Sequence, residues 1–146
     1  PYGVFVIQGN IRADGIGDAL SRYGAQLVLL ATMGWILSAG LLHVIVGGDS
    51  SAVGAVFGVR QGINLGSGLV ASLGFLALSL ALASRTEFNR IAALFVAAAS
   101  VVSLVATVVG ISDSSQMQMM TMVSGICYII FTIWSITLGL GLLKKS

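Results

Sequence analysis

The chain has 146 residues, of which 57% are hydrophobic and only 8% are charged, and its mean hydropathy is +1.03. These values lie far outside the composition of soluble globular domains, so the sequence indicates an integral membrane protein. The formal net charge is +2, without a basic cluster dense enough to follow a phosphate backbone, which argues against nucleic acid as a partner. The single cysteine, Cys127, cannot form an internal disulfide and is expected to be a small buried apolar residue.

Residues 1–24 mix polar and apolar positions and are expected to form a cytoplasmic or interfacial segment. Ile16, Ala19, Leu20 and Tyr23 share one face at helical spacing, which predicts a short interfacial helix. A solvated tail is the alternative, because glycines weaken regular structure; the segment contains Gly3, Gly9, Gly15 and Gly17.

The rest of the chain, residues 25–146, divides into four apolar blocks separated by short polar stretches. A helix needs about 20 apolar residues to cross the hydrocarbon layer, and each block is long enough. Short connections join neighbouring helices that run in opposite directions. The sequence therefore predicts an all-α domain of four transmembrane helices in an up-down-up-down bundle, at about 25–46, 52–83, 91–111 and 119–143.

The basic residues flank these blocks on one predicted side of the membrane. Short loops that hold lysine and arginine tend to stay in the cytoplasm. The opposite loops carry Asp49 and Asp113 and neither lysine nor arginine. Both termini are therefore predicted to be cytoplasmic, on the side of Arg12, Arg22, Arg85, Arg90, Lys144 and Lys145.

The second predicted helix carries a glycine at every fourth position. At 100° per residue these glycines drift by only about 40° per step and form one strip along the helix. Such small-residue faces allow close packing of helices in membranes, which predicts a glycine zipper, although chance spacing is the alternative in a glycine-rich chain. Gly68 lies off this strip and is expected to tolerate a larger side chain. The strip consists of Gly54, Gly58, Gly62 and Gly66, and the third helix offers a matching strip of Ala99, Ser103 and Thr107.

A polar face with Arg60, Asn64 and Ser67 lies opposite the glycine strip on the same predicted helix. A helix with two faces that avoid lipid is expected to be central in a bundle or an oligomer. Arg60 is predicted either to be buried beside an acidic partner, Asp49 or Asp113, or to lie at the outer interface. The interface is an alternative because the helix is longer than the hydrocarbon layer.

A second group of residues collects toward the outer ends of the first and fourth helices. Imidazole and thioether groups can bind Cu(I), so a copper site is conceivable there. The spacing matches no established ligand signature, and methionine is commonly an adaptable apolar filler, so no metal or other cofactor is expected. The group comprises His43, Met117, Met119, Met120 and Met122.

The sequence contains no phosphate-binding loop, no HExxH or CxxC motif, and no acidic residue inside a predicted helix. We therefore expect a non-enzymatic membrane subunit that is surrounded by lipid and packs against copies of itself or other integral proteins. One alternative is a small oligomeric channel or transporter whose path is lined by Arg60, Asn64 and Ser67. The other is a metal- or pigment-binding redox subunit that uses His43 and the methionines between Met117 and Met122.

Overall fold

The computed structural model describes residues 16–47, 50–85, 88–113 and 115–143, and these residues contain helices and no strand. The helices are α2 (Ile16–Gly47), α3 (Ser50–Ala83), α4 (Arg90–Ser112) and α5 (Met117–Leu143). Each is long and apolar enough to cross a membrane, so the predicted class of a four-helix membrane protein is confirmed. The bounds of α3, α4 and α5 agree with the predicted ones to within two residues.

The first helix begins earlier than predicted, at Ile16 instead of near Ala25. Asp18 and Arg22 are one turn apart and form an ion pair of 2.9 Å, which stabilises the first turns of the helix. Ser21 is fully buried and donates a hydrogen bond to the Asp18 carbonyl. Residues 16–24 therefore belong to α2. The remainder of the predicted N-terminal segment lies outside the described residues.

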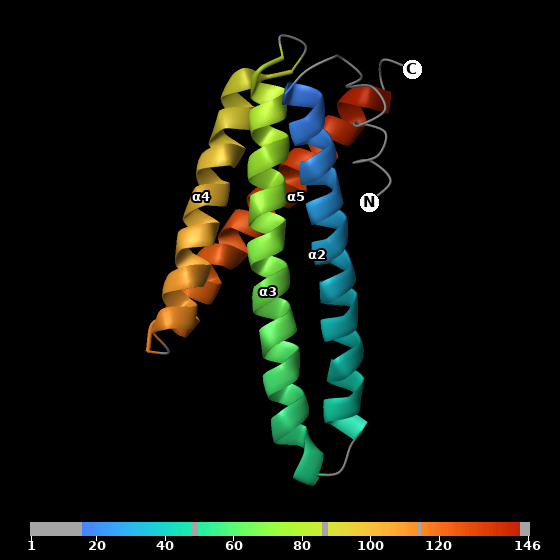
Figure 1. Ribbon diagram of the computed structural model, residues 1–146, viewed down its shortest axis with the longest axis vertical. Coiled ribbons are helices and arrows are strands. Elements are labelled where there is room, and N and C mark those ends of the chain that lie inside the picture. Colours follow the sequence, from blue (N-terminus) through green and yellow to red (C-terminus); the bar gives the residue numbers. More distant parts are fainter. Residues whose placement is uncertain (1–15, 48–49, 86–87, 114, 144–146) are drawn as a thin grey trace.

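The helices pack in chain order, α2 on α3, α3 on α4 and α4 on α5. Figure 1 shows α2 and α3 side by side over their whole length, α4 on the other side of α3, and α5 crossing behind them obliquely. In the most apolar stretch of each helix, 56% of the α3 residues are buried, compared with 17% of the α2 residues and 22% of the α5 residues. Among the described helices, α3, for which the sequence predicted two faces that avoid lipid, is thus the central one.

Close contact between α2 and α3 depends on two glycines that face each other. A Cβ atom placed on Gly24 would lie 2.7 Å from the Gly74 carbonyl oxygen, and one on Gly74 would lie 2.9 Å from the Gly24 carbonyl oxygen. These distances are too short for any side chain, so only glycine permits this approach of two backbones. Because lipid provides no hydrophobic drive between helices, such close packing must hold α2 and α3 together.

The core of the other three helices combines apolar side chains with hydroxyl groups. Phe75 of α3 and Phe131 of α5 stack with ring centroids 4.4 Å apart, next to the fully buried Val96 of α4. The Ser72 hydroxyl donates to the Ser103 hydroxyl at 2.9 Å, and both residues are completely buried. This bond joins α3 to α4 and pairs polar groups that have no access to water.

Polar caps fix both ends of α4. The Asn89 side chain accepts hydrogen bonds from the backbone N–H groups of Ile91 and Ala92, as a helix N-cap does. At the other end, Asp113 accepts from the backbone N–H and the hydroxyl of Ser115. These bonds favour the charged form and lower the pKa of Asp113 below its ordinary value.

The hairpin of α2 and α3 is longer than the pair of α4 and α5. With 23 residues, α4 is about 34 Å long and matches the hydrocarbon layer, whereas α3, with 34 residues, reaches about 51 Å. Figure 1 accordingly shows the hairpin extending past the turn between α4 and α5. Arg60 is 23 positions before Ala83, the last residue of α3, and therefore lies about 34 Å from that end of the helix. Arg60 is thus level with the far end of α4, which has the same length.

Candidate functional site

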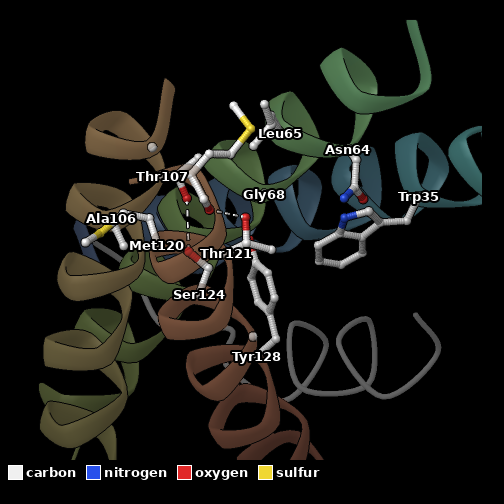
Figure 2. A pocket seen from close by; sticks show the side chains of 13 residues that line it. Trp35, Asn64, Leu65, Gly68, Ala106, Thr107, Met120, Thr121, Ser124 and Tyr128 are labelled. Atoms are coloured by element: carbon white, nitrogen blue, oxygen red, sulfur yellow. Dashed lines mark hydrogen bonds between the residues drawn. The ribbon is translucent and has the colours of Figure 1, made fainter. Parts of the chain in front are cut away.

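A cavity of about 230 Å³ lies between α3, α4 and α5, and α2 contributes one residue to its wall. Figure 2 shows the side chains that surround it. Asn64 and Thr121 line the cavity and are exposed, so it opens to the surface of the protein. The lining consists of Trp35, Asn64, Leu65, Gly68, Ala106, Thr107, Gly110, Met117, Met120, Thr121, Ser124, Gly125 and Tyr128.

The wall of this cavity is polar in places but carries no ionisable acid, lysine, arginine or histidine among its lining residues. Thr107 donates to the Ser103 carbonyl at 2.8 Å and lies 3.4 Å from the Ser124 hydroxyl, which links α4 to α5. Thr121 donates to the Met117 carbonyl at 2.7 Å. The hydroxyl protons of the two threonines are therefore already used within the protein.

Two other polar groups of the cavity have no hydrogen-bond partner in the described part of the chain. They are the side-chain amide of Asn64 and the indole N–H of Trp35, and Figure 2 shows them at the same end of the cavity. The Trp35 ring meets the Tyr128 ring edge to face, with centroids 5.4 Å apart. An amide offers both donors and an acceptor, and an indole offers one donor, so this end can bind a neutral polar group.

Two glycines leave room for the side chains of this region. A Cβ atom on Gly68 would lie 2.6 Å from the Tyr128 hydroxyl, and one on Gly110 would lie 3.2 Å from the Met120 Cβ atom. The expectation that Gly68 tolerates a larger side chain is therefore wrong. The helical wheel places Gly68 off the glycine strip correctly, but it contains no information on the aromatic side chain that α5 brings to this position.

The structure separates the three residues of the predicted polar face. Asn64 lines the cavity, whereas the Ser67 hydroxyl donates to the Ile63 carbonyl at 2.7 Å and packs against Gly34 of α2. The Arg60 side chain is half-buried, and its Nε donates to the Ser38 carbonyl of α2 at 3.2 Å. The cavity wall thus includes one of the three residues.

The structure describes one of the two acidic partners that the sequence suggested for Arg60. Asp113 uses its carboxylate to bind Ser115, and Asp49 lies outside the described residues. Within the described part of the chain, the partner of Arg60 is a backbone carbonyl of the neighbouring helix. Every residue carries such a carbonyl, so sequence reasoning had no signal that could single out Ser38.

The two predicted packing strips lie in different surroundings. Ala99, Ser103 and Thr107 are all buried, on the side of α4 that faces its neighbours. The glycine strip of α3 is exposed, and no atom lies within 4 Å of a Cβ atom placed on any of its glycines. Within the described chain, therefore, no helix covers Gly54, Gly58, Gly62 and Gly66.

The residues of the conceivable copper site are not gathered in one place. His43 is exposed on α2 and is not part of the cavity wall, whereas Met117 and Met120 are part of it. Met119 and Met122 are exposed on α5. The described residues contain no cluster of three or more histidine, cysteine and acidic side chains that could hold a metal ion.

Sequence reasoning missed Trp35 and Tyr128 as residues of the site. Each is an aromatic residue with a polar tip inside an apolar helix, and such a residue commonly finds a polar neighbour in the interior of the protein. That signal was present in the sequence. It could not indicate that the two rings, from the first and last helices, would meet.

Comparison of this chain with protein families, with curated proteins and with solved structures gave no match. The geometry of the chain itself therefore carries the functional argument.

Proposed function

We propose that this protein is a non-enzymatic membrane subunit that assembles with further copies of itself or with other integral membrane proteins through the glycine strip of α3. The single observation that carries the proposal is the open space beside Gly54, Gly58, Gly62 and Gly66. Glycine faces in membrane helices serve close helix packing, and this one meets no helix in the described part of the chain.

The other half of the same helix supplies a comparison within the molecule. Leu73 and Leu80 fall on the same angular sector of α3 as the glycine strip, and they are 45% and 43% exposed. Large aliphatic side chains are what a lipid-facing surface needs. Along this one face of α3, exposed leucines are replaced by exposed glycines. This change supports the proposal that the leucine half contacts lipid and that the glycine half contacts a helix of another protein chain.

The packing elsewhere in the chain supports the same use of glycine. Gly24, Gly74 and Gly34 all lie at contacts where an added Cβ atom would collide with the partner helix. The end of the α2–α3 hairpin that contains Gly54 and Gly58 extends beyond α4 and α5, and so has fewer neighbours in the described part of the chain (Figure 1). A second copy or another subunit would cover the exposed glycines of the strip.

We further propose that the helices cross the membrane in an up-down-up-down order with both termini in the cytoplasm. Arg22, Arg85 and Arg90 support this orientation, because they lie near the start of α2 and the junction of α3 with α4, at one end of the bundle. Cysteine substitution tests it. Ser115→Cys should react with an impermeant maleimide from outside intact cells, and Ser84→Cys should react only after permeabilisation. The reverse pattern would refute the orientation.

The assembly itself is tested by the native mass of the detergent-solubilised protein. The wild type should exceed the 15.0 kDa of one chain, and Gly62→Leu should reduce the assembly or release its partners. Gly40→Leu is the matched control, because Gly40 lies on α2 and is also exposed, with no atom of the described residues within 4 Å of an added Cβ atom. A single-chain mass for the wild type, or equal assembly of both variants, would refute the proposal.

A further inference from the structure

We infer that the cavity between α3, α4 and α5 is a binding site for one small uncharged molecule that combines a ring-sized apolar body with a hydroxyl group, of the chemical class of the phenols. This inference is independent of the assembly proposed above, because none of the four strip glycines lines the cavity. It rests on the volume of the cavity, the absence of charge in its wall, and the two unpartnered polar groups at one end.

The volume sets the size of the ligand. A cavity of about 150 Å³ holds one benzene molecule in a protein interior. The present cavity, at about 230 Å³, has room for one substituted ring and is too small for a large cofactor. Leu65, Ala106, Met117 and Met120 provide apolar wall for the ring, and methionine side chains adapt to irregular shapes.

The wall chemistry sets the charge of the ligand. A charged molecule in such surroundings needs an opposite charge beside it, because the loss of hydration costs several kcal/mol per ion. The lining residues include no such charge, and Arg60 is held by the Ser38 carbonyl outside the cavity. A neutral ligand is therefore favoured over the corresponding anion or cation.

The unpartnered groups set the functional group of the ligand. Asn64 and Trp35 lie at the same end of the cavity without a hydrogen-bond partner in the described residues (Figure 2). A hydroxyl group can donate to the Asn64 amide oxygen and accept from the Trp35 indole N–H at the same time. The Trp35 and Tyr128 rings, in edge-to-face contact, offer aromatic surface to the body of the ligand.

The experiment uses Trp35 as the reporter and 4-bromophenol as the probe, because bromine quenches indole fluorescence on contact. The chain has two tryptophans, and Trp134 does not line this cavity, so Trp134→Phe leaves Trp35 alone. The full chain in lipid nanodiscs is titrated with the probe. Quenching should saturate, and the negatively charged 4-bromobenzoate should quench at least tenfold more weakly.

Matched leucine substitutions on α5 test the location. Gly125 lines the cavity with open space beside it, so Gly125→Leu should fill the cavity and weaken binding at least tenfold. Gly139 has the same open space but lies elsewhere on α5, so Gly139→Leu should bind like the parent. Asn64→Leu exchanges two side chains of similar size at an exposed position, and it should also weaken binding. This variant tests the location if Gly125→Leu does not fold.

The outcomes separate binding from partition into lipid. Quenching that rises linearly with probe concentration, to the same extent in all variants, would show that the probe only dissolves in the bilayer and would overturn the inference. Saturable quenching that Asn64→Leu leaves unchanged would overturn it as well, because the probe would then bind at a different place.

Discussion

The contact of Gly24 with Gly74 makes a quantitative prediction about the stability of the α2–α3 hairpin. In Gly74→Ala the new methyl group would lie 2.9 Å from the Gly24 carbonyl oxygen and 3.0 Å from the Val28 backbone nitrogen. Ordinary contacts of a Cβ atom lie between 3.4 and 4 Å. Backbone atoms cannot rotate out of the way as a side chain can, so α2 must move away from α3.

Two effects of opposite sign determine the size of the change. Overpacking a tight contact costs about 1–3 kcal/mol. Replacing glycine by alanine inside a helix contributes up to about 1 kcal/mol in favour of the folded state, as measured in water. We therefore expect Gly74→Ala to lower the free energy of unfolding by about 1–2 kcal/mol.

Gly62→Ala is the matched control on the same helix, because no atom of the described residues lies within 4 Å of its new methyl group. In the dispersed single chain it should leave stability unchanged or raise it by up to about 1 kcal/mol, since only the propensity term acts. The double variant Gly24→Ala with Gly74→Ala should lose less than the sum of the two single variants. The first methyl group already separates the helices, so the second meets less resistance.

The buried thiol of Cys127 provides the assay. It is the only cysteine of the chain and is 5% exposed, so a fluorogenic maleimide reacts with it when the protein unfolds. Unfolding is followed across an SDS titration for each variant. If Gly74→Ala is as stable as Gly62→Ala, the two backbones do not approach as closely as described, and the packing argument for α2 and α3 fails.

Three further predictions concern polar groups. Removing the bond between α3 and α4 by Ser72→Ala or Ser103→Ala should cost about 0.5–2 kcal/mol, and a double-mutant cycle in the same SDS assay should show coupling, whereas additive effects would contradict the bond. Arg60→Lys should destabilise the hairpin as Arg60→Leu does, because an ammonium group does not reproduce the hydrogen bond from Nε to the Ser38 carbonyl. If Arg60→Lys has wild-type stability in thermal unfolding, the residue 60 side chain only contacts the lipid headgroups. The lowered pKa of Asp113 means that its carboxylate stabilises the fold above the unfolded-state pKa of about 3.9, and that this contribution is lost as pH falls through the lower folded-state value. Asp113→Asn should therefore flatten the acid end of the stability profile measured by circular dichroism, and an unchanged profile would contradict this role.

The sequence by itself determined the class of the protein, the number of helices and most of their bounds. Apolar runs of membrane-spanning length leave few alternatives, because a backbone in lipid must satisfy its hydrogen bonds within a helix. Only the start of α2 differed, since an ion pair between Asp18 and Arg22 and a buried Ser21 extend the helix into a stretch that looked like a separate segment. Helical periodicity also placed the four glycines of the strip on one side of α3, where all four are exposed.

The tertiary structure decided what each face meets. Periodicity places a residue at an angle around its own helix, but it does not contain the position of any other helix, so Gly68 was taken as unconstrained although α5 brings Tyr128 against it. For the same reason the sequence could not identify the Ser38 carbonyl as the partner of Arg60, because every residue carries a backbone carbonyl. The cavity arose in the same way, since its wall combines residues from four helices whose separations along the chain are large. These features depend on distances between helices, which are set by how the small and large side chains of all four fit together.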